Sequence, residues 1–250
     1  MHVNTVFTDV LAFGPHDAWA VGRWSIVPDA PPRPLIERWN GESWQILDAP
    51  AFDTWTELYA VSGTGPDDVW AVGNSEVLVA DAWVERALIE HWDGEAWSVY
   101  TLPAGAKHRF DASNLEDVVA ISPSDVWAVG EVTTARRTRN LSLHFDGEGW
   151  TRVPVANPSD DTQMLAGVAA LAGDRVFAVG TYLDERAGGF RTLVERWDGE
   201  RWRVVGSENR RSGGELSEVV AMPGFRFAVG QAWSNRLHDY RTLGLQRQPA

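Results

Sequence analysis

Short stretches rich in β-branched and aromatic residues recur along the chain, and turn residues separate them. Residues 115–121 (Leu-Glu-Asp-Val-Val-Ala-Ile) form one such stretch; a Ser-Pro-Ser-Asp turn follows, and Val-Trp-Ala-Val-Gly at 126–130 comes next. Short apolar runs between turn residues predict strands, and no segment keeps the 3.6-residue period of a helix. The pattern therefore predicts an all-β protein.

The same pattern returns about every 50 residues. The tripeptide Ala-Val-Gly occurs five times, each time after an aromatic residue. A second signature with an Asn-Gly or Asp-Gly turn follows in the first four copies, and a Trp lies three residues after its glycine. Several strands in a repeat of this length are typical of a β-propeller, in which each unit is one blade. The five Ala-Val-Gly glycines are Gly22, Gly73, Gly130, Gly180 and Gly230.

Each unit divides into four strands, since the Asp-Gly pair is a typical hairpin turn. We predict one domain, a five-bladed β-propeller of four-stranded antiparallel blades. The second signature decays in the fifth unit, so the last blade is expected to be incomplete or to be closed by the N-terminal segment. The expected units are residues 7–57, 58–114, 115–164, 165–215, and 216–250 with 1–6.

Two sequence blocks carry a resemblance to a known group of proteins. Asp-Val-Trp-Ala-Val-Gly at 68–73 and 125–130, and Ile-Glu-His-Trp-Asp-Gly-Glu-Ala-Trp at 89–97, resemble a family of bacterial Trp-rich propeller repeats that is related in pattern to kelch-like propellers. Members of that family are often parts of secreted or lipid-anchored proteins of unassigned function. The resemblance implies the fold but no chemistry.

Composition excludes several classes of function. The formal net charge is −13, which argues against binding to nucleic acid. There is no cysteine, so disulfides and thiolate metal sites are excluded. No apolar run is long enough to cross a membrane, and no export signal is visible. We expect a monomer without a cofactor, cytoplasmic as the sequence stands and secreted if the chain is a trimmed piece of an exported protein.

The longer connections are expected to share one rim of the propeller. In an antiparallel blade, alternate connections lie at opposite ends of the sheet. Loops on a rigid scaffold are common binding sites, so this rim is the expected functional face. The second-to-third-strand connections are residues 23–34, 74–87, 131–140, 181–192 and 231–242, and those to the next blade are 48–57, 101–114, 155–164 and 206–215.

Aromatic and basic residues in these connections are the candidate ligand-binding residues. They could stack on or pair with a small molecule, a glycan or a protein segment, and this binding function is the leading hypothesis. The aromatic residues could equally pack beneath the loops as lids. The candidates are Trp24, Trp55, Trp83, Trp233, Tyr182, Tyr240, Arg136 and Arg137.

The alternative is an enzyme (a hydrolase, lyase or cyclase) with acid–base groups at the channel mouth. No nucleophile elbow, phosphate-binding loop or metal-binding motif occurs, and the histidines lack ligand-like spacing, so no metal site is predicted. The carboxylates of Asp9, Asp117 and Glu218 share one repeat position, while the strand-three residues Glu37, Glu90 and Glu195 are expected to be structural. The catalytic candidates are Glu57, Asp117, His108 and His238.

Overall fold

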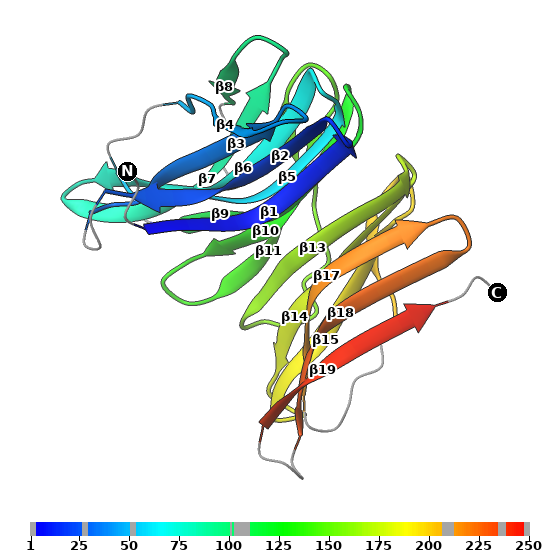
Figure 1. Cartoon of the computed structure of the whole chain (residues 1–250). Coiled ribbons are helices and arrows are strands. Elements are labelled where there is room, and N and C mark those ends of the chain that lie inside the picture. The colour runs from blue at the N-terminus through cyan, green and yellow to red at the C-terminus, as the bar shows by residue number, and fades with distance from the viewer. Residues whose placement is uncertain are drawn as a thin grey trace.

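The computed structural model describes residues 4–26, 30–50, 54–100, 102, 111–206, 213–234 and 239–247. In this part of the chain, nineteen strands form five antiparallel sheets. The sheets follow one another in chain order, and the first strand of each contacts the first strand of the next. Figure 1 shows the resulting curved row of blades, from blue at the N-terminus to red at the C-terminus. The predicted five-bladed β-propeller is confirmed.

Four of the blades have four strands each. The first contains β1 (Asn4–Gly14), β2 (Asp17–Ser25), β3 (Arg33–Trp39) and β4 (Trp44–Ile46). The second contains β5 (Thr56–Gly65), β6 (Asp68–Val79), β7 (Ala82–Trp92) and β8 (Trp97–Val99). The third contains β9 (Ala112–Ser122), β10 (Asp125–Thr133), β11 (Thr138–Phe145) and β12 (Trp150–Arg152). The fourth contains β13 (Gln163–Ala172), β14 (Arg175–Asp184), β15 (Gly189–Trp197) and β16 (Trp202–Val204).

The fifth blade has three strands, β17 (Glu215–Met222), β18 (Phe225–Ser234) and β19 (Asp239–Arg247). The prediction of an incomplete last blade is therefore confirmed. Closure by the N-terminal segment is wrong for the described residues, because residues 4–14 form β1 and pair with β2 along their whole length. Residues 1–3 lie outside the described part.

A bulge in the first strand explains the Ala-Val-Gly repeat. One extra residue interrupts the pairing opposite each of these glycines. A Cβ atom at Gly180 would lie 2.0 Å from the carbonyl oxygen of Met164, and one at Gly22 would lie 2.0 Å from that of Val6. Only glycine lets the two backbones approach this closely.

Tryptophan pairs fill the interfaces between blades. The second-strand Trp of one blade meets the fourth-strand Trp of the next blade edge to face, an arrangement favoured by the ring quadrupole. These contacts form one buried cluster for each of the first three interfaces. The ring centroids are 5.6 Å apart for Trp19 and Trp97, 5.4 Å for Trp70 and Trp150, and 5.5 Å for Trp127 and Trp202.

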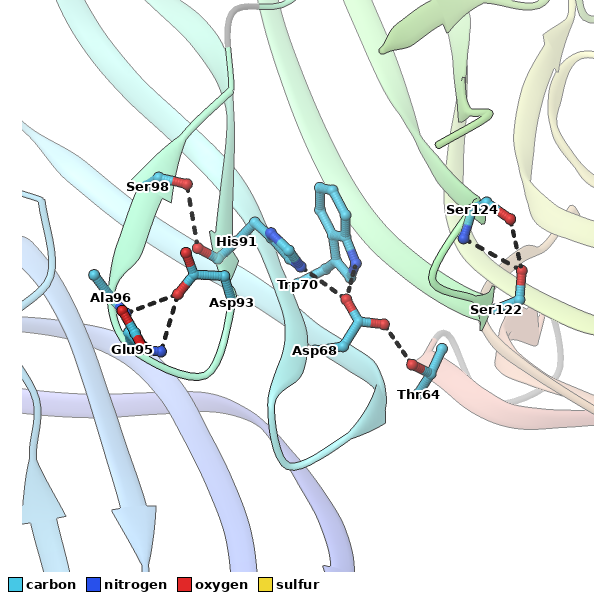
Figure 2. A network of polar contacts seen from close by, with 10 residues as sticks. All are labelled: Thr64, Asp68, Trp70, His91, Asp93, Glu95, Ala96, Ser98, Ser122 and Ser124. Atoms are coloured by element: carbon cyan, nitrogen blue, oxygen red, sulfur yellow. Dashed lines mark hydrogen bonds and ion pairs between the residues drawn. The ribbon is translucent and has the colours of Figure 1, made fainter. Parts of the chain in front are cut away.

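A polar network around Asp68 explains the rest of the motif (Figure 2). The Asp68 Oδ1 atom accepts hydrogen bonds from Trp70 Nε1 at 3.2 Å and pairs with His91 Nε2 at 2.7 Å. The His91 ring stacks on Trp70 with 4.0 Å between centroids. His144 pairs with Asp125 in the same way in the third blade, so both histidines join the second and third strands of their blades.

The outward face of the first blade is uncovered. Phe7, Val10 and Trp44 are 50%, 63% and 44% exposed. The equivalent side chains of the later blades are buried by the preceding blade, including those of Leu58 and Val61. The first blade therefore presents half of an inter-blade interface to solvent.

The register of the strands places the second-to-third connections and the blade-to-blade connections at one rim. The bounds of the strands that flank the blade-to-blade connections agree with the prediction. The predicted second-to-third connections of the second, third and fourth blades are too long, because the strands continue into them as hairpins. Residues 74–87 are strand except for Ala80 and Asp81, which adopt positive φ angles of 46° and 68°. Cross-strand pairs such as Val77 with Val84 hold the ends together. The third- and fourth-blade turns likewise shrink to residues 134–137 and 185–188.

Candidate functional site

The long hairpin of the second blade carries an exposed apolar surface on this rim. Leu78 and Trp83 face each other across β6 and β7 and are 57% and 56% exposed. Trp55 is 45% exposed, and its carbonyl oxygen accepts a hydrogen bond from the Glu76 N–H at 2.8 Å at the base of the hairpin. We call Trp55, Leu78 and Trp83 the blade-2 patch.

Four of the other predicted binding residues lie in strands rather than in loops. Trp24 is in β2, with the Arg33 guanidinium 5.8 Å from its ring centroid. Tyr182 is half-buried in β14 and packs against the cluster between the third and fourth blades, as the lid interpretation requires. Tyr240 is exposed on β19, and Trp233 is in β18, where its side chain lies outside the described residues.

The predicted binding residues are therefore spread over several blades. Arg136 and Arg137 are exposed in the turn between β10 and β11, where both backbone N–H groups donate to Thr134 Oγ1. Trp55 and Trp83 share the second blade, whereas Tyr182 and Tyr240 belong to the fourth and fifth. The arrangement favours a local binding surface over one pocket lined by all candidates.

The Glu57 carboxylate is held by two donors. Its Oε2 atom lies 2.6 Å from Arg23 Nη1, and its Oε1 atom accepts a hydrogen bond from Trp55 Nε1 at 2.8 Å. Glu57 is buried, and Arg23 comes from the neighbouring first blade. The pair links two blades and positions the Trp55 indole of the blade-2 patch.

Asp117 is engaged in a similar link between the third and fourth blades. It accepts hydrogen bonds from the N–H groups of Val118 at 2.7 Å and Val168 at 2.6 Å. Burial, reinforced by the charge of Glu218, raises the pKa of Asp117 well above its ordinary value. Asp9 binds the N–H of Val61 in the second blade at 2.8 Å in the same manner.

These aspartates therefore join neighbouring blades near the propeller axis. Both Asp117 oxygens accept backbone donors, as do both Asp9 oxygens. The remaining catalytic candidates, His108 and His238, lie outside the described residues. Of the four catalytic candidates, the structure therefore describes only Glu57 and Asp117.

A group of ionisable side chains between the second and third blades was not predicted. Tyr59 and Glu116 are the extra residues of the strand bulges in β5 and β9. Burial, together with the charges of Glu116 and Glu85, raises the pKa of Glu131 to about 7. Burial and the Glu57 charge also raise the Tyr59 pKa. The sequence could have indicated this group, because Tyr59 and Glu116 share one repeat position, directly after a core leucine.

The described part of the chain lacks both a metal-binding cluster and a membrane-spanning helix. Its residues include no group of three or more His, Cys, Asp or Glu side chains arranged to hold a metal ion. It also has no helix of the length and apolarity needed to span a membrane.

Solved structures share the fold at low sequence identity. YCF48 bound to a D1 peptide aligns with a TM-score of 0.53 and 13% identity, covering 97% of this chain and 69% of that one. A polysaccharide lyase, an ulvan lyase, aligns with a TM-score of 0.61 and 9% identity over 88% of this chain and 60% of the lyase. The sucrose-6-phosphate hydrolase of Lactobacillus gasseri aligns with a TM-score of 0.55 and 8% identity, over 96% and 58%.

These likenesses establish the propeller architecture alone. The chain spans only about three fifths of the lyase and of the hydrolase. No protein-family model matches the chain, and no curated protein matches it. The fold is thus shared with a peptide-binding protein and with enzymes, and it supports more than one kind of function.

Proposed function

We propose that the protein is a non-catalytic binding module whose ligand docks on the rim that carries the blade-2 patch. The ligand is a protein segment, a glycan or a small molecule with an apolar surface. The observation that carries the proposal is the exposure of Leu78 and Trp83 as a cross-strand pair on a protruding hairpin. Exposed large apolar side chains grouped together mark interaction sites.

The hairpin presents these side chains in a fixed geometry. β6 and β7 pair continuously from Val69 with Trp92 to Val79 with Ala82, so little conformational freedom remains to be lost on binding. A Trp ring offers a large contact area, and such residues dominate binding energies at protein interfaces. Trp55 is oriented in turn by the Glu57 carboxylate.

The test is a screen of the labelled protein against peptide and glycan arrays, followed by titration of the strongest hit. We expect Trp83→Ala to weaken that binding by about tenfold or more, the loss expected for a central aromatic contact. Trp44→Ala is the matched control, since Trp44 is similarly exposed but lies on the outward face of the first blade. Equal effects of the two substitutions, or none from Trp83→Ala and Trp55→Ala, would contradict the proposal.

A second candidate function is an acid–base enzyme, and it is favoured by Glu131. A carboxyl group with a pKa of about 7 is suited to proton transfer near neutral pH. Turnover of any rim ligand that falls by about a hundredfold or more in Glu131→Gln, a typical contribution from general acid–base catalysis, would support the enzyme. Binding without turnover supports the module.

A further inference from the structure

The outer edge of the fifth blade combines a cavity with a strand edge that pairs with no other described strand. β19 is the last strand of its sheet, whereas a fourth strand covers the equivalent strand in each of the other blades. A cavity of about 410 Å³ lies beside it, within the size range of ligand pockets. Its walls include Phe177 and Val205 on one side and Phe227 and Leu245 on the other.

This cavity occupies the place where the second, third and fourth blades bury their fourth-strand Trp. In the fourth blade, Trp202 belongs to a buried cluster that contains residues from the second strand of the third blade. One repeat later, the equivalent residues line the cavity. Trp127, Val129, Val168 and Ala178 around Trp202 correspond to Phe177, Val179, Val219 and Ala228 around the cavity.

We propose that β19 binds an extended segment of a partner protein as a fourth strand, with an aromatic side chain of that segment in the cavity. The other blades show the chemistry of such a segment. It is a Trp followed two or three positions later by an aliphatic residue, as in Trp97-Ser-Val99 and Trp202-Arg-Val204. Addition of a strand to a sheet edge is a general mode of peptide recognition.

The fifth blade offers contacts for both the backbone and the aromatic side chain of such a segment. In the fourth blade, the Val205 N–H donates to the Val194 carbonyl oxygen at 2.9 Å, and Gly244 holds the position of Val194 in β19. The Arg226 guanidinium lies 4.8 Å from the Phe177 ring centroid at the wall of the cavity. A cation in this place can also stack on an incoming aromatic ring.

The chain's own described strands are not available for this role. Residues 4–14 are paired as β1 in the first blade. The four existing fourth strands each pair with their own third strand, so a second copy could donate one only by breaking a blade. A separate extended segment has no such cost, and this favours a partner protein as the donor.

The site is independent of the rim proposed above. It uses the edge of β19 and the space between the fourth and fifth blades, and none of the blade-2 patch residues lines it. Loss of one activity by substitution therefore leaves the other testable.

The probe is a fluorescein-labelled peptide with the sequence of residues 198–205, Asp-Gly-Glu-Arg-Trp-Arg-Val-Val. We expect a saturable rise in its anisotropy with the 250-residue protein, and binding weaker by about tenfold or more when its Trp is replaced by Ala. Gly206→Leu should weaken binding similarly, since Gly206 lines the cavity and a Cβ there meets no atom within 4 Å. Gly65→Leu, with equally open surroundings in the second blade, should leave binding unchanged.

Hydrogen exchange of the unsubstituted protein provides a second measurement that does not depend on the folding of any variant. Bound peptide should slow amide exchange in residues 239–247. Absence of saturable binding at millimolar peptide, or protection confined to another blade, would overturn the proposal. So would a concentration-dependent dimer that the peptide dissociates, because the groove would then belong to a second copy of the chain.

Discussion

At the scale of single residues, one repeat position has very different surroundings in different blades. Glu195 is buried and accepts hydrogen bonds from Asn140 Nδ2 at 3.1 Å and the Ala156 N–H at 3.0 Å. Both oxygens of Glu90 are buried, and no described residue donates a hydrogen bond to them.

The first blade has prolines at both of the repeat positions that supply these donors. Pro34 corresponds to Asn140 and lacks its side-chain amide, and Pro50 corresponds to Ala156 and has no backbone N–H to donate. Burial without a partner raises the pKa of Glu90 to about 8.

We therefore predict that Glu90→Leu stabilises the protein by about 1–4 kcal/mol at pH 8. Leucine already fills this position in the third blade, at Leu143. The folded pKa of Glu90 is about 8 against an ordinary value of 4.5, so the wild-type protein loses stability as the pH rises between these values. Urea denaturation should show a gain that grows from pH 4.5 to pH 8.

Glu195→Leu is the matched comparison and should have the opposite sign. It removes the acceptor of the Ala156 N–H and one of the two acceptors of the Asn140 amide, which also donates to the Ala156 carbonyl oxygen, at a cost of about 1–3 kcal/mol. Similar effects from the two substitutions would show that hydrogen-bond partners do not distinguish these glutamates.

At the scale of elements, the bulged first strand and the Ala-Val-Gly strand depend on each other. The extra residue moves the first-strand backbone against the glycine, and a Cβ at Gly180 would meet Met164 O at 2.0 Å and Leu165 Cα at 2.9 Å. Neither atom belongs to a flexible side-chain end, so the backbone itself would have to shift.

We predict that Gly180→Ala lowers the free energy of unfolding by about 2–4 kcal/mol through this overlap. Gly149→Ala is the control, because a Cβ there meets no atom within 4 Å. The midpoints of urea unfolding measure both effects. A Gly180→Ala protein as stable as the control would mean that the bulge is not needed for blade formation.

At the scale of the whole molecule, identical repeat positions differ because the two ends of the row of blades have no neighbouring blade among the described residues. Trp150 is buried between Trp70 and Phe145, with ring centroids 5.4 Å and 5.6 Å away. Trp44 is 44% exposed and meets only Trp39 among the aromatic contacts of the described residues, at 5.8 Å.

Trp150→Ala should consequently cost about 3–5 kcal/mol, as expected for a buried aromatic residue. Trp44→Ala should cost less than about 1 kcal/mol, because much of its surface already meets water. Thermal or chemical unfolding of the two variants makes the comparison. An equal loss for both would show that the outward face of the first blade is covered in solution.

The amino-acid sequence by itself determined the repeat, the five blades and the shortened last blade. These features depend on local pairing and on residues that repeat along the chain. The Ala-Val-Gly glycine, such as Gly180, recurs in every unit, and the fourth-strand Trp recurs in the first four. The sequence pattern did not predict how far the strands extend into the hairpins. Beyond the buried core, the strands are held together by cross-strand pairs such as Leu78 with Trp83. Three features depend instead on tertiary packing: Glu90 has no donor among the described residues, Glu57 binds Arg23, and a cavity takes the place of a fourth-strand Trp in the fifth blade. Each of these depends on residues of a neighbouring blade, about one repeat away in the chain, and the packing of blades alone brings them together.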